Sequence, residues 1–242
     1  MGAYNLNSLS NHLHADTVVS NDVLSTLLRK VYAWMSLSLL LTGFTAYTVS
    51  KNQTLLELLY TNSAALIVLV VAQFGLAILF TARLFKMSLN VGGALFAFYS
   101  LLTGLMFSSV FLLYTSESIA STFFITAGTF GAMSLYGYFT KNDLSSMSKF
   151  LYMGLIGVII ASLVNLLLQS STVMWITTYV GVIVFVGLTA YDTQKIKEML
   201  IMQSHEGLTE NSMKVALYGS FMLYLDFINL FLKLLRIFGR RK

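Results

Sequence analysis

Two aspartates lie within or beside long apolar segments, where a carboxyl group has few ways of being stabilised. Asp226 lies in the middle of the apolar stretch 217–235, and Asp192 directly follows the stretch 175–190. A carboxylate at the centre of a bilayer is costly unless it is protonated, paired or hydrated. Taken alone, Asp192 is an ordinary residue at a helix boundary. If the two helices pack side by side, however, the carboxyl groups cannot both ionise cheaply and would titrate as a unit near neutral pH. Such a pair would suit a pH sensor or a hard-oxygen site for Ca²⁺.

Three further polar residues accompany this pair. At helical spacing, Asp226, Asn229 and Lys233 share one face of the last apolar segment. A polar stripe on an apolar helix must face protein or water, so we predict that this helix is central and that Asn229 and Lys233 face a pore. Arg83 ends the second apolar segment. It is either a positively charged anchor that reaches the interface or a latch that pairs with a carboxylate when the bundle is closed.

The elements that must position these residues are membrane helices. Of the 242 residues, 57% are hydrophobic and 10% are charged, whereas a soluble domain is about 45–50% apolar and about 25% charged. So few charges cannot cover a water-facing surface, which excludes a soluble enzyme and a disordered chain. Only helices and closed barrels satisfy the backbone in lipid, and the apolar runs lack the alternation of barrel strands. The sequence therefore predicts an all-α membrane protein.

Seven apolar runs approach the length of about 20 residues that a transmembrane helix needs. They cover residues 31–50, 64–82, 88–113, 119–139, 150–168, 173–191 and 215–236. We therefore expect a polar, partly flexible N-terminal tail at 1–28, a seven-helix transmembrane domain at 29–238 and a basic C-terminal tail at 239–242. Small residues at Gly92 and Gly93, and at Gly128 with Ala132, favour close helix packing.

Lysine and arginine are divided unevenly between the two sets of connections. Nine lie on one side, and these are Arg29, Lys30, Arg83, Lys86, Lys141, Lys149, Lys195, Lys197 and Lys214. The opposite loops carry only Lys51, so the N-terminus is predicted to be cytoplasmic. Seven crossings would then place the basic tail outside, against the same rule. Either the last helix crosses against the rule or it is re-entrant, and we favour the full crossing because residues 215–236 are long enough.

Enzyme chemistry finds little support in the sequence. The chain has no cysteine and no proline, which excludes disulfides and thiolate metal sites. His12, His14 and His205 lie in polar segments without a partner at helical spacing, so we expect no metal cofactor. An intramembrane aspartyl protease would need Gly-x-Gly-Asp where this chain reads Leu223-Tyr-Leu-Asp226, and a Pro-Ala-Leu element that it lacks. We therefore expect a protein that is not an enzyme and does not bind nucleic acid.

Two motifs resemble the signatures of the Bax inhibitor-1 family, the transmembrane BAX inhibitor motif group. They are Gly187-Leu-Thr-Ala-Tyr-Asp-Thr-Gln-Lys-Ile and Leu223-Tyr-Leu-Asp-Phe-Ile-Asn-Leu-Phe, the second with Leu-Leu-Arg-Ile-Phe-Gly after it. The resemblance covers roughly residues 25–240, and the short tail and loops indicate a bacterial member of the plasma (inner) membrane. One departure is the long segment 195–214 between the motifs, which would lengthen the last two helices or cap a gate.

The resemblance implies a seven-helix bundle wrapped around its last helix and a pH-sensitive Ca²⁺ leak. It implies that Asp192 and Asp226 form the sensor and that Arg83 is the counterpart of an arginine that latches onto the first aspartate. The expected partners are thus the lipid bilayer, calcium ions and protons. The alternative function is an interaction protein that regulates or engages a membrane-bound quality-control protease through the tail at 1–28. A proton-coupled transporter also remains open, because a carboxylate pair suits proton relay.

Overall fold

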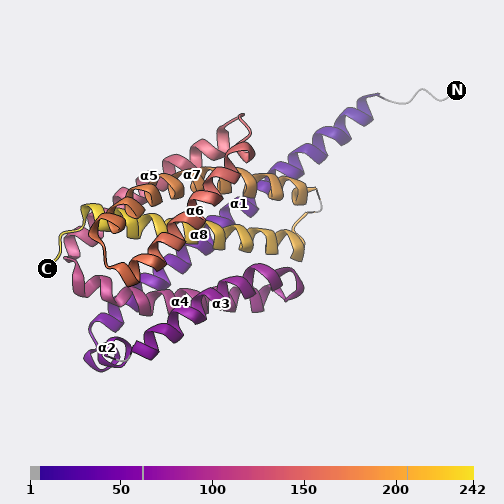
Figure 1. Ribbon diagram of the computed structural model, residues 1–242. Coiled ribbons are helices and arrows are strands. Elements are labelled where there is room, and N and C mark those ends of the chain that lie inside the picture. Colours follow the sequence, from indigo (N-terminus) through magenta and orange to yellow (C-terminus); the bar gives the residue numbers. More distant parts are fainter. Residues whose placement is uncertain (1–5, 62, 206) are drawn as a thin grey trace.

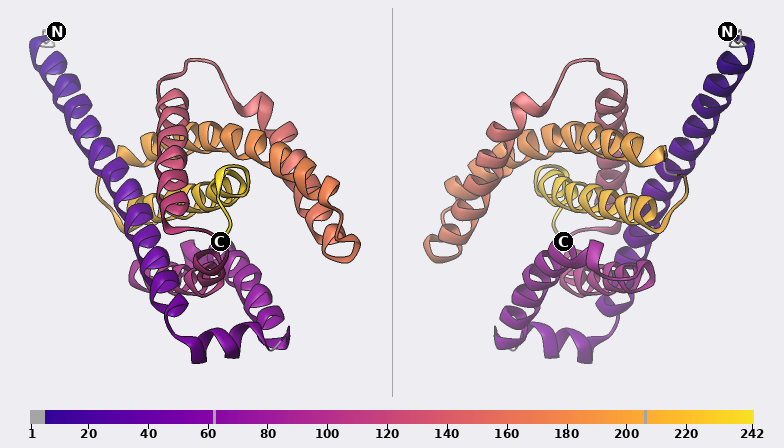
Figure 2. Two further views of the ribbon diagram at one scale, coloured as in Figure 1. Left: turned by 90° about the vertical axis from the view of Figure 1, so that its left-hand side faces the viewer. Right: turned by 90° about the vertical axis from the view of Figure 1, so that its right-hand side faces the viewer.

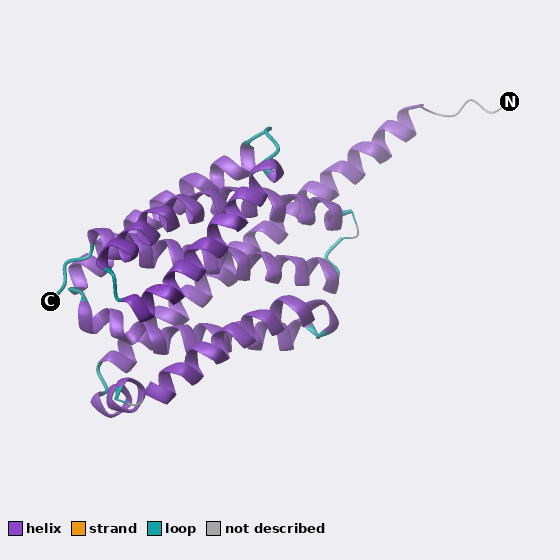
Figure 3. Ribbon diagram, viewed as in Figure 1, coloured by secondary structure: helices purple, strands orange, loops and turns teal. Residues whose placement is uncertain are grey.

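The computed structural model describes residues 6–61, 63–205 and 207–242, which are helical apart from short connections (Figure 1, Figure 3). The helices are α1 (Leu6–Ser50), α2 (Gln53–Tyr60), α3 (Ser63–Arg83), the short 3-10 helix η1 (Leu84–Lys86), α4 (Leu89–Leu113), α5 (Ser116–Phe139), α6 (Ser145–Leu168), α7 (Ser171–Ser204) and α8 (Glu210–Phe238). The all-helical prediction is confirmed for this part of the chain. The expected lengthening of the last two helices is also present, because α7 continues to Ser204 and α8 begins at Glu210.

Six of the described helices are long and apolar enough to cross a bilayer by length and composition. They are α3 together with η1, α4, α5, α6, α7 and α8. The predicted number of seven spans is not confirmed, because residues 31–50 form the second half of α1, where serine and threonine dilute the apolar side chains. Large apolar side chains cover the outer helices, and Phe150 and Leu167 of α6 are 74% and 88% exposed. Such an apolar surface suits contact with lipid.

The N-terminal part of the chain, predicted as a polar, partly flexible tail at 1–28, is helical where the structure describes it. Within the described residues, α1 runs unbroken from Leu6 to Ser50, and its first turns project beyond the other helices (Figure 1, Figure 2). No proline occurs, and no glycine lies between Gly2 and Gly43, so no helix-breaking residue interrupts this stretch. The predicted boundary at residue 28 is therefore not an end of secondary structure. Residues 1–5 lie outside the described part.

Helix α8 occupies the centre of the bundle, as predicted. Of its most apolar 18 residues 72% are buried, against 11% in α3 and in α6. It packs against α1, α4, α5 and α7, and the end-on views of Figure 2 show it surrounded by other helices. On one side its Phe221 ring lies 4.3 Å from the ring centroid of Phe80 and 5.4 Å from that of Phe96. This buried aromatic contact joins α8 to α3 and α4.

The four residues after α8, which we call the C-terminal strap (residues 239–242), pair with the turn between α4 and α5. The Thr115 backbone N–H donates to the Arg240 carbonyl at 3.0 Å, and the Lys242 N–H donates to the Leu113 carbonyl at 3.0 Å. The strap thus lies at the far end of α4 from Arg83; we call this the strap end of the bundle. Helix α8 has 29 residues, about 44 Å, and traverses the whole bundle, so a re-entrant last helix does not fit.

The structure confirms the close helix packing predicted at one of the two small-residue positions and not at the other. A Cβ at Gly93 would lie 3.2 Å from the Trp34 ring of α1, and one at Gly92 would lie 3.1 Å from Leu217 of α8. Close packing at Gly92 and Gly93 is therefore confirmed. A Cβ at Gly128 would meet nothing within 4 Å, so the expectation of close packing there is wrong. Glycine on an outward-facing part of a helix carries no such role.

Candidate functional site

Helices α7 and α8 approach each other closely at two glycines, one on each side of the aspartates. A Cβ at Gly219 would lie 2.8 Å from Cγ2 of Ile196, and one at Gly181 would lie 2.8 Å from Cε of Lys233. As the residue numbers rise on one helix they fall on the other, so the helices are antiparallel. Both helices are continuous between these contacts. This register places residues 192 and 226 about one helical turn from being directly opposite each other, close enough for their side chains to meet.

The carboxyl groups of Asp192 and Asp226 lie within hydrogen-bonding reach of each other. Both residues are buried, with 4% and 5% exposed. A carboxylate can only accept a hydrogen bond, so a bond between two carboxyl groups requires that one of them carry a proton. The structure thus brings the two predicted residues together in an arrangement that one shared proton would stabilise. Their role as a sensor stays a prediction.

One oxygen of each aspartate is buried and has no hydrogen-bond donor among the described residues. These atoms are Asp192 Oδ1 and Asp226 Oδ2. Buried polar atoms nearly always have a partner, so these oxygens are places for a proton, a water molecule or a cation. Ca²⁺ takes about 6–8 oxygen ligands. Within the described chain no third acidic or histidine side chain joins the pair, so a Ca²⁺ ion here would keep part of its water shell.

The charged and titratable groups close to the pair come from α6, α7 and α8, and they are Tyr152, Tyr191, Lys195 and Tyr218. The Lys195 amine interacts with Asp192 electrostatically and lies 5.8 Å from the ring centroid of Tyr191. Tyr152 of α6 packs edge-on against Tyr191, with ring centroids 6.1 Å apart. Lys195 thus supplies a positive charge beside the pair. Sequence reasoning gave no site role to Lys195 or Tyr152, because their types and spacing do not distinguish them from other interfacial residues.

Arg83, the predicted latch, lies at the end of α3 and is exposed. In the described part of the chain it makes no ion pair with either aspartate. The ion pair found there joins Lys214 to Glu210 at 3.0 Å, and Glu210 also accepts the Leu89 backbone N–H at 3.2 Å. The structure therefore does not bring Arg83 to the pair. A latch would belong to a different conformation.

Asn229 and Lys233, the predicted pore-facing residues, are both half-buried. The Asn229 side-chain amide donates to the Leu225 carbonyl of its own helix at 2.8 Å. Lys233 lies along Gly181 of α7, on the side of α8 that faces α7. Lys233 therefore lies at the interface of α7 and α8, Asn229 bonds within α8, and lining a pore stays a prediction for both.

A second polar cluster, which sequence reasoning missed, joins α8 to α1 and α4. The Tyr224 hydroxyl lies 2.7 Å from Thr42 Oγ1, which donates to the Ser100 carbonyl at 3.0 Å. Nearby, the Gln73 side-chain amide donates to Thr103 Oγ1 at 3.1 Å. Serine and threonine in membrane helices commonly bond to carbonyls of their own helix. Their types and spacing therefore gave no signal of contacts between helices.

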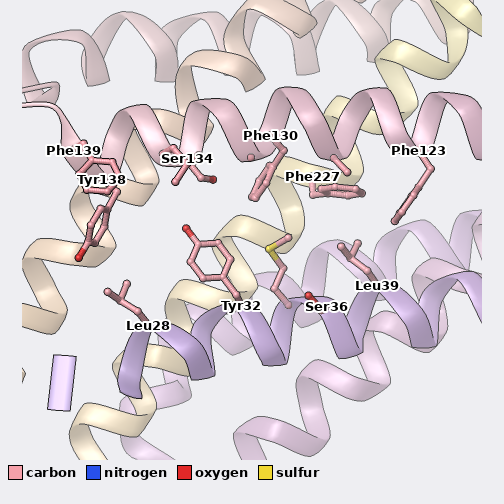
Figure 4. A pocket seen from close by; sticks show the side chains of 14 residues that line it. Leu28, Tyr32, Ser36, Leu39, Phe123, Phe130, Ser134, Tyr138, Phe139 and Phe227 are labelled. Atoms are coloured by element: carbon pink, nitrogen blue, oxygen red, sulfur yellow. The ribbon is translucent and has the colours of Figure 1, made fainter. Parts of the chain in front are cut away.

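An apolar cavity of about 560 Å³ lies between α1 and α5 and is separate from the aspartate pair (Figure 4). Phe130 of α5 and Phe227 of α8 line it, and Figure 4 shows Tyr32 of α1 and Ser134 of α5 reaching toward each other across it. Tyr32 is within hydrogen-bonding reach of Ser134 and Thr193. Neither aspartate lines this cavity, so its apolar wall is not the ion site.

These features define a class: a polytopic helical membrane protein with a buried acid pair between its last two helices. The family model described as "Inhibitor of apoptosis-promoting Bax1" matches residues 24–242. The chain therefore belongs to the Bax inhibitor-1 family, as its two motifs indicated.

Curated relatives match along nearly their whole length. The chain is 54% identical to inner membrane protein YbhL of Escherichia coli strain K12, over 90% of this chain and 93% of YbhL. It is 47% identical to an uncharacterized protein of Borreliella burgdorferi, over 89% of this chain and 92% of that one. It is 46% identical to an uncharacterized protein of Rickettsia prowazekii, over 88% and 89%.

Proposed function

We propose that the protein is a pH-sensitive calcium leak channel of the bacterial inner membrane, gated by Asp192 and Asp226. The observation that carries the proposal is the buried carboxyl pair, with two oxygens that lack a hydrogen-bond donor in the described chain, between the central helix and its neighbour. Membership of the family and the likeness to an inner membrane protein support the location. Passage of an ion needs no covalent chemistry, so the proposed role is not enzymatic.

Protonation acts on two steps with opposite effects. In the closed state Arg83 would pair with Asp192, and adding protons to the aspartates would remove this attraction and loosen the gate. The same protons compete with Ca²⁺ for the carboxyl oxygens and would weaken its binding. Calcium flux is therefore expected to pass through a maximum as the pH falls, rather than rise steadily.

The test is Ca²⁺ entry into dye-loaded liposomes that contain the purified protein, with pH varied on each side. Wild type is compared with the Asp192→Asn/Asp226→Asn variant, in which each side chain keeps its size. Asp143→Asn is the matched control. It is the same aspartate-to-asparagine substitution, made in the exposed connection between α5 and α6. We expect a pH-dependent leak that the double variant loses and the control keeps. No entry above that of empty liposomes, or an unchanged pH profile in the double variant, would contradict the proposal.

The latch is tested separately by Arg83→Gln, with Lys86→Gln as its control. Both residues are exposed basic residues at the same turn, so both variants change the surface charge equally. Arg83→Gln should raise the leak under conditions in which the wild type is closed, whereas Lys86→Gln should not. Equal effects of the two variants on the leak would contradict the latch and indicate that Arg83 is only a charged anchor at the interface.

A second candidate function, engagement of a membrane-bound quality-control protease, finds support in the projection of α1 beyond the other helices (Figure 2). A chain that lacks residues 1–20 should then lose co-purification with such a protease and keep its Ca²⁺ leak. Loss of the leak together with the interaction would show instead that this part of α1 supports the bundle.

A further inference from the structure

Two basic side chains lie next to each other at the interface of α7 and α8 near the strap end. Lys233 and Arg236 are one turn apart on α8, and their charges interact unfavourably. Both are half-buried. Among the described residues neither has an acidic partner, since the ion pair found there joins Lys214 to Glu210. Two like charges inside a membrane helix are costly unless another group offsets them.

Contacts with α7 hold both side chains in place. Arg236 Nη1 donates to Thr178 Oγ1 at 3.2 Å, and the Thr178 hydroxyl donates to the Met174 carbonyl at 2.7 Å. The stem of Lys233 lies against Gly181, where any larger residue would collide with it. The site therefore holds a guanidinium with most of its five N–H donors unused, beside an ammonium with three.

The depth of the site matches the headgroup region of a bilayer. Lys233 lies five residues before Phe238 at the end of α8, about 8 Å along the helix. On α7, Trp175 and Tyr179 flank Thr178, stack with ring centroids 5.7 Å apart and are 39% and 54% exposed. Exposed tryptophan and tyrosine mark the membrane–water interface.

The local charge also favours an anion. The strap adds Arg240, Arg241 and Lys242 to the same end of the bundle, whereas the acidic residues at this end are Glu57 of α2 and Glu117 of α5. Arginine and lysine together bind phosphate through charge-assisted hydrogen bonds, the guanidinium often by two at once.

We propose that Lys233 and Arg236 form a binding site for a phosphate group at the interface of α7 and α8, with Thr178 holding the Arg236 guanidinium in place. The group belongs to a phospholipid headgroup or to free phosphate, since both present the same oxygens. The site does not depend on the proposed calcium leak, and binding to it is measured without any ion flux.

The test uses purified protein in detergent and three probes. Phosphatidylglycerol and diacylglycerol with the same acyl chains differ by the headgroup phosphate, and inorganic phosphate lacks the chains. Bound lipid is counted by native mass spectrometry, and phosphate binding is measured by calorimetry. We expect phosphatidylglycerol to bind in preference to diacylglycerol. Lys233→Met or Arg236→Gln should weaken this binding about tenfold, because each removes a charge-assisted hydrogen bond.

Arg241→Gln is the matched control, because Arg241 is an exposed basic residue of the strap at the same end of the bundle. The affinity of this variant for phosphatidylglycerol should stay within about twofold of the wild-type affinity, as expected for an exposed charge. Inorganic phosphate binding that both the Lys233 and the Arg236 variants weaken, without preferential binding of phosphatidylglycerol, would support the phosphate site and identify its ligand as free phosphate. Equal binding of the two lipids without binding of inorganic phosphate, or an equal loss in all three variants, would overturn the proposal.

Discussion

Replacing Gly219 with alanine tests the close packing of α7 against α8 that brings the two aspartates together. A Cβ at this position would lie 2.8 Å from Cγ2 of Ile196 and 3.1 and 3.2 Å from its Cγ1 and Cδ1. Ile196 is 1% exposed and β-branched, so it has few other rotamers to adopt. Overpacking of this kind costs about 1–3 kcal/mol, whereas replacing a helical glycine with alanine gains about 1 kcal/mol. The free energy of unfolding should therefore fall by about 0–2 kcal/mol.

A control variant separates the steric cost from helix propensity. Gly128→Ala gains the same propensity, but its Cβ meets nothing within 4 Å. The two variants should thus differ in unfolding free energy by about 1–3 kcal/mol. Ile196→Ala removes the colliding atoms, so the Gly219→Ala/Ile196→Ala variant should be more stable than the sum of its single changes predicts. Unfolding is followed by circular dichroism in mixed micelles of increasing SDS content. Equal stability of the two glycine variants, with additive effects in the double variant, would refute the close contact.

Three further predictions concern other parts of the bundle. Tyr224→Phe removes the hydroxyl that lies 2.7 Å from Thr42 Oγ1; it should cost about 0.6–1.5 kcal/mol, and a double-mutant cycle with Thr42→Val should recover most of this as coupling. Gln194→Ala removes two hydrogen bonds of 2.9 Å to the backbone between α5 and α6, so amide exchange should accelerate in that connection and not elsewhere in α7. Hydrogen bonds from the Ser145 hydroxyl and backbone N–H hold the pKa of the Asp143 carboxyl below its usual range. These bonds contribute to stability above the ordinary pKa of an aspartate, and this contribution is lost as the pH falls through the lowered pKa of Asp143. An NMR titration should therefore give Asp143 a higher midpoint in Ser145→Ala than in wild type.

The helices were predictable where apolar composition and capping residues agree. The predicted segment 88–113 matches α4, which begins at Leu89 because Ser88 accepts the Val91 N–H as an N-cap. The predicted apolar segment 173–191 covers only the apolar part of α7, because it ends where hydropathy falls. Lysine, glutamate, methionine and leucine then follow, and they favour a helix as well as apolar residues do, so α7 continues to Ser204. The same reasoning explains the helix at 6–28, since a polar stretch without breakers is free to be helical.

The candidate site was predictable in its residue types and not in its geometry. A carboxyl group in an apolar segment marked Asp226 and Asp192 as exceptional. That they meet depends on the register of α7 and α8, which Gly181 and Gly219 set through contacts that sequence spacing alone does not specify. Arg83 lies exposed at the end of α3, and its type and position in the sequence do not distinguish a residue that pairs with a carboxylate from a charged anchor.

The central position of α8 has a consequence for how the protein is made. Of the described helices it is the last to leave the ribosome, so α1–α7 enter the bilayer before the helix around which they pack exists. Until then Asp192 lacks its neighbour on α8, and Thr42 keeps its bond to the Ser100 carbonyl but lacks the Tyr224 hydroxyl. A polar group without a partner in lipid costs free energy. A nascent chain that stops before Glu210 therefore keeps polar faces open to other membrane proteins. Insertion of α8 closes these faces, so an unfinished chain differs from a finished one in the polar groups that it leaves exposed in the bilayer.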